Sequence, residues 1–228
     1  MYDDDVPGPS QRSRPTRGAG SRWRRPGAIA ALVVSVLALY LWWSGRTPEP
    51  PPLDPARETV VFLGNSITGG HGLPVETTFP LRLGAALGLR VRNAGISGDT
   101  TAGALARIER DVLAHRPKLV VVELGANDAF RRVPVETTLD NLRAIVRRLR
   151  QDGAGVLLLH LRLPPFGGEA YRQGMRKIAH EEGVWLSEDF LEGVVPDLTT
   201  DGLHPTAEGH ARLAVRLEPV LRGILRSP

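Results

Sequence analysis

The sequence predicts an α/β protein: a three-layer, doubly wound sandwich around a five-stranded parallel sheet, preceded by one N-terminal transmembrane helix. From residue 58 onward, short apolar segments alternate with longer segments of helical periodicity, the pattern of parallel strands joined by helices. One strand-like segment, residues 119–124, is almost continuously apolar, as expected of a strand covered on both faces. An uncharged stretch at residues 26–45 is long enough to cross a bilayer.

The elements follow in order from these periodicities. Strands are predicted at residues 59–63, 89–93, 119–124, 156–161 and 184–186. Helices are predicted at residues 79–87, 101–115, 136–151, 169–182 and 206–225. The helical pattern is clear in residues 136–151, where apolar side chains recur at intervals of three and four: Leu139, Leu142, Ile145, Val146 and Leu149. Because sites in such sheets form beyond the carboxyl ends of the strands, the residues that follow each strand are candidates for function.

Three segments precede the predicted domain, which we place at residues 58–228. Residues 1–25 form a basic tail with few apolar side chains, predicted to be disordered and cytoplasmic. Residues 26–45 are predicted to form a transmembrane signal-anchor helix, with aromatic side chains at its outer end. Residues 46–57 hold five prolines and are predicted to form an extended linker.

The tail carries six arginines against three aspartates, and this charge predicts the orientation of the helix. Arginines before an apolar segment keep that side in the cytoplasm, so the domain is expected on the other side. A cleaved signal peptide, which would leave a secreted domain, is the alternative. An uncleaved anchor is favoured because bulky residues from Leu39 to Trp43 stand where a signal peptidase needs small ones.

Charge and cysteine content exclude several classes of function. The net charge is +4, and removing the tail leaves 23 basic and 22 acidic side chains. A domain with so small a positive excess is not expected to bind nucleic acid. The chain has no cysteine, which excludes disulfides, thiolate metal ligands and a lipid-modified cysteine.

Ser66 follows the first predicted strand, and Asp201 and His204 lie near the C-terminus. Serine after glycine is often only a turn residue. A carboxylate three residues before a histidine, however, can reach the imidazole Nδ1 and stabilise the cation that forms when the histidine takes a serine proton. We therefore predict a relay in which Ser66 attacks, His204 moves the proton and Asp201 orients the imidazole. A metal site at Asp201 and His204 is less well supported, because no cluster of further ligands accompanies them.

An acyl-transfer site also needs donors for the developing oxyanion. Gly98, in a glycine-rich turn after the second strand, can offer its N–H, and Asn127 after the third strand can offer its side-chain amide. The N–H of Ser66 completes the predicted oxyanion hole. Taken singly, Gly98 is explained as a turn residue and Asn127 as a helix cap. Their order on successive strand ends favours the catalytic interpretation.

The other histidines carry weaker signals. His71, five residues beyond Ser66, is a candidate to line the cleft. His115, His180 and His210 fall in predicted helices and are expected on their surfaces, and His160 lies at a strand end. No role in the reaction is assigned to these four.

The blocks around these residues resemble those of the SGNH, or GDSL-type, hydrolase superfamily, which has a flavodoxin-like fold. Its Ser, Gly, Asn and His blocks match residues 64–66, 95–100, 125–128 and 201–205. Within it the chain is most similar to the thioesterase I/lysophospholipase-like (arylesterase) branch, on the phrases Val122-Glu123-Leu124-Gly125 and Ile96-Ser97-Gly98-Asp99-Thr100. The resemblance covers residues 58–225 and implies an acyl-enzyme on Ser66, formed without a metal or cofactor.

The chain departs from the family pattern at two places. The usual GDS is here Gly64-Asn65-Ser66, so that an amide replaces the carboxylate beside the nucleophile. Phe166-Gly167 follows Leu163-Pro164-Pro165, where those thioesterases tend to have an Asn-Tyr-Gly-like stretch that helps shape the acyl pocket. A preference for acyl chain length is therefore not carried over.

The sequence thus predicts a membrane-anchored serine esterase that hydrolyses carboxylic acyl esters or thioesters. The expected partners are a small acyl ester or lipid-like substrate and, through residues 26–45, the bacterial inner (cytoplasmic) membrane, crossed once, with the catalytic domain on the periplasmic side. A carbohydrate O-acetylesterase, which would need a small and open acyl pocket, is the alternative enzyme. The alternative of another class is a non-catalytic, membrane-tethered binding module.

Overall fold

The structure is a computed structural model that describes residues 32, 34–36, 48–162 and 168–226. The chain divides into two compact units, Met1–Arg46 and Thr47–Pro228. In the first unit the described residues are helical. Within the described ranges, no helix is both long and apolar enough to cross a membrane. The disordered tail predicted at residues 1–25 and nearly all of the transmembrane segment predicted at residues 26–45 lie outside those ranges.

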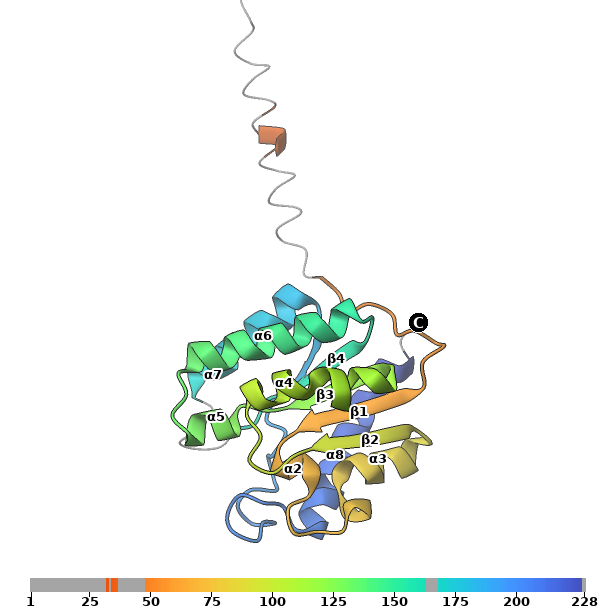
Figure 1. The fold of residues 1–228 in the computed structure, drawn as a ribbon, viewed down its shortest axis with the longest axis vertical. Helices are drawn as coiled ribbons and strands as arrows, with labels where there is room; N and C mark the ends of the chain where they lie inside the picture. The colour runs from red at the N-terminus through yellow and green to blue at the C-terminus, as the bar shows by residue number, and fades with distance from the viewer. Residues whose placement is uncertain (1–31, 33, 37–47, 163–167, 227–228) are drawn as a thin grey trace, which may run out of the picture. The chain divides into compact units, whose positions relative to one another are not determined.

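The second unit is built around a sheet of five parallel strands in the order β2-β1-β3-β4-β5 (Figure 1). The strands are β1 (Thr59–Gly64), β2 (Arg90–Gly95), β3 (Pro117–Glu123), β4 (Gly155–Leu159) and β5 (Trp185–Ser187). The parallel sheet predicted from the sequence is confirmed, and the strand ends differ from the predicted ones by at most two residues.

The helices connect these strands in chain order. They are α2 (Ser66–Gly69), α3 (Phe79–Leu87), α4 (Thr101–Asp111), α5 (Ala126–Phe130), α6 (Val135–Gln151), α7 (Glu169–Glu182) and α8 (Ala207–Arg226), with 3₁₀ turns η1 (Val75–Thr77) and η2 (Leu113–His115). The helix predicted at residues 101–115 is shorter, because the backbone leaves the helical region at Val112 and continues as η2. Helices α2 and α5 were not predicted, since four or five residues are too few to show periodicity.

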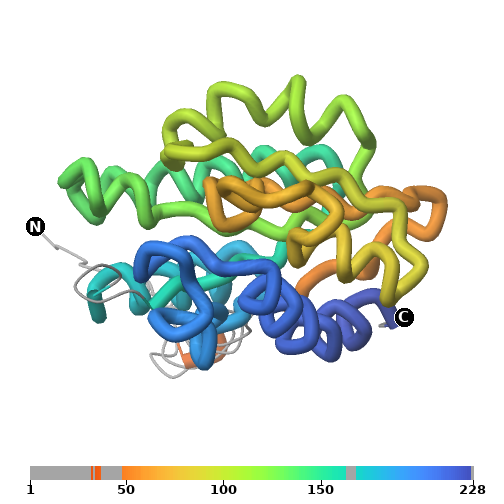
Figure 2. Tube along the Cα trace, turned by 90° about the horizontal axis from the view of Figure 1, so that it is seen from below, coloured from red at the N-terminus to blue at the C-terminus, as the bar shows by residue number. Residues whose placement is uncertain are grey.

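Alternate residues of the central strands face two separate hydrophobic clusters. Val61, Leu63 and their counterparts on β3 and β4 pack against α4, α6 and α7. Val60, Phe62 and their counterparts pack against α3 and α8. Figure 2 shows α8, in blue, on the opposite side of the sheet from α4, in yellow-green. Helices on both faces make the three-layer, doubly wound sandwich that the sequence predicted.

At the carboxyl end of the sheet, the backbone of β2 lies very close to the turn that follows β1. A Cβ atom on Gly95 would lie 2.2 Å from the backbone N of Gly69, so only glycine permits this approach of β2 to α2. In the sheet register, Gly64 pairs with Gly95 on one side and with Glu123 on the other. The segments that follow β1, β2 and β3 therefore begin side by side.

Residues 48–57, predicted to be part of a linker, pack along the domain in the structure. Leu53 packs on the cluster under α8, close to Gly155. The Arg57 guanidinium donates from Nη1 to Asp152 Oδ2 at 2.7 Å and to the Pro117 carbonyl at 3.1 Å. The compact unit consequently begins at Thr47, before the domain boundary predicted at residue 58.

Replacing Arg57 by alanine is expected to lower the free energy of unfolding of Thr47–Pro228 by roughly 1–3 kcal/mol, because it leaves partly buried acceptors on Pro117 and Asp152 without their donor. Urea unfolding measures the change. Arg147→Ala is the matched control: this guanidinium pairs with Glu182 but is 58% exposed, and its loss is expected to cost at most about 1 kcal/mol. Equally small losses in both variants would show that residues 48–57 do not belong to the folded unit.

Candidate active site

The turn after β1 presents Ser66 at the carboxyl end of the sheet. Ser66 is the first residue of α2, and the side chain of Asn65 caps this short helix by accepting the N–H of Ile67 at 2.8 Å. Asn65 is 1% exposed and Ser66 is 8% exposed. Donors in the first turn of a helix have no acceptor inside that helix, so the Ser66 N–H remains available to a ligand.

Ser66, His204 and Asp201 form one chain of hydrogen bonds across the molecule. The Oγ of Ser66 lies 2.9 Å from Nε2 of His204, and Nδ1 of His204 lies 2.6 Å from Oδ2 of Asp201. The structure thus brings together three residues that the sequence singled out, although Ser66 and His204 are 138 positions apart. The order is that of a nucleophile, a base and an orienting carboxylate.

The loop before α8 holds Asp201 in an arrangement that keeps it ionised. Its Oδ1 accepts the backbone N–H groups of His204 at 2.8 Å and of Leu203 at 3.0 Å. The backbone N–H of His204, followed by its imidazole, holds the pKa of Asp201 well below its usual range. A carboxylate with these donors stays charged over the pH range in which histidine side chains titrate.

A second imidazole covers the ring of His204. The ring centroids of His71 and His204 are 4.4 Å apart, with the planes tilted by 31°. His71 is exposed, its backbone N–H donates to the Ser66 carbonyl at 3.0 Å, and its Nδ1 lies 3.5 Å from the Ser97 hydroxyl. The sequence made His71 a candidate for the cleft, and the structure places it on the face of the predicted base.

Gly98 lies on the loop that follows β2, and Asn127 lies in the first turn of α5, just after β3. Gly98 has a φ of +77°, and its carbonyl accepts Nη2 of Arg131 at 2.9 Å. In the part of the chain that the structure describes, no acceptor takes the Gly98 N–H. Asn127 donates from Nδ2 to the Asp99 carbonyl at 2.9 Å, which joins α5 to the loop after β2. The amide group has a second hydrogen, which this bond does not use.

The buried carboxylate of Glu123 was missed as a neighbour of the site. It accepts Asn65 Nδ2 at 2.7 Å, the Thr68 hydroxyl at 2.8 Å and the Thr68 N–H at 3.2 Å. Burial raises the pKa of Glu123 to about 7, against the opposing effect of these donors. A single carboxylate inside the apolar run 119–124 was the signal that could have found it, because a charged side chain in a buried strand needs partners.

His210 corrects an expectation from the sequence. It was predicted on the surface of the last helix, but it is 1% exposed, and its Nδ1 accepts the N–H of Phe79 at 3.2 Å. Burial lowers the pKa of His210 to about 4, so it is neutral at pH 7 and joins α8 to α3. Among the described residues, no three histidine, aspartate or glutamate side chains cluster so as to hold a metal ion.

Comparison with known proteins gives a family. Residues 62–212 match the model of the GDSL-like Lipase/Acylhydrolase family. The chain is similar to an arylesterase of Vibrio mimicus, with 36% identity over 70% of this chain and 86% of the relative. It is also similar to thioesterase 1/protease 1/lysophospholipase L1 of Escherichia coli K12, with 33% identity over 70% of this chain and 81% of the relative.

Solved structures agree with the sequence comparison. The crystal structure of TesA is 37% identical and has a TM-score of 0.69, covering 74% of this chain and all of that one. The resemblance noted from the sequence is thereby confirmed, and the non-catalytic binding module is set aside because the matched family is one of hydrolases. The chain belongs to the GDSL-like lipase/acylhydrolase family and is a serine hydrolase that acts on ester bonds.

Proposed function

We propose that Ser66 is the nucleophile of this esterase, His204 its general base and Asp201 the group that orients the imidazole. The observation that carries the proposal is the pair of short contacts on His204, 2.9 Å to Ser66 Oγ and 2.6 Å to Asp201 Oδ2. In this arrangement Nε2 can accept the proton of Ser66. Nδ1 keeps its proton and donates it in a hydrogen bond to the carboxylate of Asp201.

The reaction proceeds through an acyl-enzyme. Ser66 Oγ attacks the substrate carbonyl carbon while its proton passes to Nε2 of His204. When the tetrahedral intermediate collapses, His204 returns this proton to the departing alcohol or thiol, and the acyl group remains on Ser66. Water then attacks the acyl carbon while its proton passes to Nε2. When this second intermediate collapses, the bond to Ser66 Oγ breaks, His204 returns the proton to Oγ, and the acid leaves.

The oxyanion is held by the N–H groups of Ser66 and Gly98 and by the Asn127 amide. Asn127 suits this role because its bond to the Asp99 carbonyl fixes the amide and leaves its second hydrogen free. Gly98 suits it because Arg131 binds its carbonyl, while among the described residues no backbone acceptor takes its N–H. Each such donor contributes about 3–4 kcal/mol to transition-state stabilisation in related chemistry.

The substrate proposed is a carboxylic acyl ester or thioester of lipid-like character. The support is the pair of relatives named arylesterase and thioesterase 1/protease 1/lysophospholipase L1. We further propose that residues 26–45 direct the enzyme to the bacterial inner membrane, with the catalytic unit on the periplasmic side, either as a retained anchor or as a signal cleaved on secretion. The uncharged run and the arginines before it support this proposal.

Hydrolysis of p-nitrophenyl acetate, butyrate, octanoate and palmitate by the full chain in detergent, beside Ser66→Ala, tests the proposal. Replacing Ser66 by alanine is expected to lower kcat by roughly 10⁶-fold, since the nucleophile itself is removed. Ser97→Ala is the matched control, because this hydroxyl is exposed and only weakly bonded to His71, and its kcat is expected to stay within about threefold of wild type.

The chain-length profile decides the substrate class. Turnover that rises toward octanoate or palmitate supports a lipid-acyl hydrolase, whereas turnover confined to acetate supports the carbohydrate O-acetylesterase. Equal hydrolysis by wild type and Ser66→Ala would mean that another residue is the nucleophile.

A further inference from the structure

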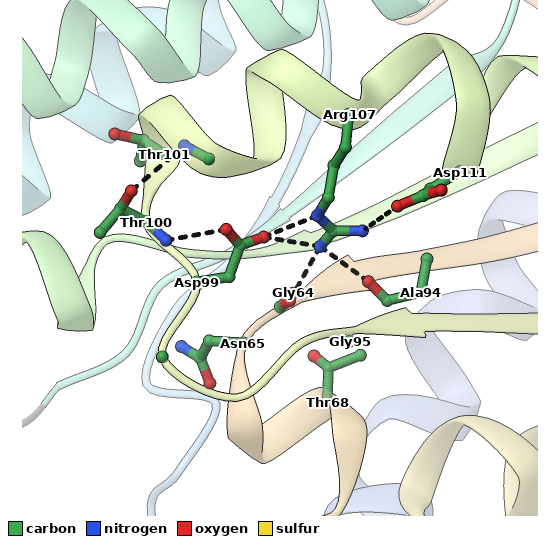
Figure 3. A network of polar contacts seen from close by, with 12 residues as sticks. Gly64, Asn65, Thr68, Ala94, Gly95, Asp99, Thr100, Thr101, Arg107 and Asp111 are labelled. Atoms are coloured by element: carbon green, nitrogen blue, oxygen red, sulfur yellow. Dashed lines mark hydrogen bonds and ion pairs between the residues drawn. The ribbon is translucent and has the colours of Figure 1, made fainter.

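Arg107, on the buried face of α4, reaches the carboxyl ends of two strands. Its side chain is 8% exposed, and Nη2 donates to the carbonyl of Ala94 at 2.8 Å and to that of Gly64 at 3.3 Å. Figure 3 shows this side chain descending from α4 to the ends of β1 and β2. Gly64 lies two residues before Ser66, so Arg107 contacts the strand end that carries the nucleophile turn.

The same guanidinium holds the loop that contains Gly98. Nε and Nη2 of Arg107 lie 2.8 Å and 2.7 Å from Oδ2 of Asp99, which directly follows Gly98. The backbone of Asp99 is fixed at both ends: its N–H donates to the Ile96 carbonyl at 3.1 Å, and its carbonyl accepts Asn127 Nδ2 at 2.9 Å. One side chain is therefore bonded, directly or through Asp99, to all three segments that carry the proposed oxyanion donors.

We propose that Arg107 is a positioning residue that sets the geometry of the oxyanion hole relative to Ser66. The proposal rests on the catalytic roles proposed above. A buried ion pair is weak evidence for a role in stability, because taking both charges out of water offsets most of their attraction. The planar fork of arginine can donate to a carboxylate and to two carbonyls in one fixed arrangement, which the single ammonium of lysine does not reproduce.

The position of Arg107 in the sequence already indicated that its charge would need partners inside the protein. Arg107 lies between Ala104 and Ile108 on the face of α4 that packs against the sheet, where an apolar side chain is expected. A charged side chain at such a position needs partners inside the protein. Gly103 makes room for that partner, because a Cβ atom there would lie 2.2 Å from Oδ1 of Asp99.

Steady-state hydrolysis of p-nitrophenyl butyrate by the full chain tests the proposal. Arg107→Lys is expected to lower kcat by roughly 10- to 100-fold with KM within about twofold, because misplaced donors weaken transition-state binding and leave substrate binding unchanged. Arg110→Lys is the matched control: Arg110 lies on the same helix and pairs with Asp111, as Arg107 does, but is 77% exposed. Its kcat is expected to equal that of wild type.

A double-mutant cycle separates positioning from a structural defect. If Arg107 acts through the oxyanion hole, Asn127→Ala lowers kcat by roughly 100-fold in wild type but by less than tenfold in the Arg107→Lys background. If Arg107→Lys only unfolds part of the protein, the two effects multiply and the measured kcat follows the folded fraction seen by circular dichroism. That outcome overturns the proposal.

Two further results keep the test decisive. Should Arg107→Lys fail to fold, Asp99→Ala takes its place, since it removes the carboxylate through which Arg107 holds the loop of Gly98. This variant is expected to lose kcat in the same way, and full activity would overturn the proposal. An inert wild type would instead contradict the proposed catalytic function. Active wild type beside a fully active Arg107→Lys contradicts only the role of Arg107.

Discussion

Replacing Asp201 by asparagine is expected to lower kcat by roughly 10³- to 10⁴-fold with little change in KM. The reason is the direction of one hydrogen bond. Oδ1 of Asp201 accepts the backbone N–H groups of Leu203 and His204, so an asparagine must keep its oxygen there and turn its amide nitrogen toward Nδ1 of His204. An amide donor at that place selects the tautomer with the proton on Nε2, which cannot accept the proton of Ser66.

The same loop offers a control for this experiment. Asp197 is exposed and lies four positions before Asp201, so Asp197→Asn removes one charge from the loop without touching the relay. Its kcat is expected to stay within about twofold of wild type. Comparable losses in both variants would point to a general effect of charge on the loop, and retention of more than a tenth of the activity in Asp201→Asn would contradict the orienting role.

The local pattern of apolar residues was sufficient to predict the parallel sheet and its longer helices. The apolar run of β3 and the three- and four-residue spacing in α6 depend only on neighbouring residues, and both elements lie where the pattern predicted them. The end of α4 was missed because Val112 leaves the helical region although Leu113 continues the apolar spacing. Burial of His210 could have been inferred, since it lies on the same face of α8 as Leu213 and Leu217.

Contacts across the sheet could not be predicted in this way. The bond between Asn65 and Glu123 joins residues 58 positions apart and exists because the register places Gly64 beside Glu123. The register depends on how whole strands pair, which the residues of one strand do not determine. The association of Ser66 with His204 was predicted from their chemistry and from the family resemblance, since neither spacing nor periodicity links them.

Replacing Asn65 by aspartate is expected to make the stability of the protein fall steeply above pH 7. Asn65 donates from Nδ2 to Oε1 of Glu123 at 2.7 Å, and both residues are 1% exposed. The new carboxylate can still cap Ile67, but its other oxygen faces Glu123 and lacks the N–H donor that Asn65 supplies. Two carboxylates so close in a buried site do not both ionise, so the folded variant must retain one shared proton.

The sign of the pH dependence follows from where that proton is bound. In wild type, burial raises the pKa of Glu123 from 4.5 to about 7, so the folded state binds the proton more tightly and the contribution of this group to stability falls as pH rises through that window, then levels off. In Asn65→Asp the folded state keeps its shared proton above pH 7, whereas the unfolded state holds none. Its stability therefore continues to fall, by about 1.4 kcal/mol for each pH unit.

Urea unfolding at pH 5, 7 and 9 measures the difference in free energy of unfolding between wild type and Asn65→Asp. This difference is expected to widen by roughly 3 kcal/mol between pH 7 and 9. Gln151→Glu adds the same charge at an exposed position and controls for net charge. The exchanged pair Asn65→Asp with Glu123→Gln restores a donor between the two side chains, and its oxygen can still accept both groups of Thr68. We expect this double variant to regain stability and to lose the dependence above pH 7.

A constant difference between Asn65→Asp and wild type from pH 7 to 9 would show that no shared proton is held, and the interpretation of this turn would be wrong. The predicted widening, reversed in the exchanged pair, would explain the amide beside the nucleophile. Asn65 supplies the donor that a second carboxylate lacks, so the buried Glu123 can accept hydrogen bonds from both Asn65 and Thr68. Asn65 also caps α2 by accepting the N–H of Ile67, so its side-chain amide holds the turn that carries Ser66 through both its oxygen and its nitrogen.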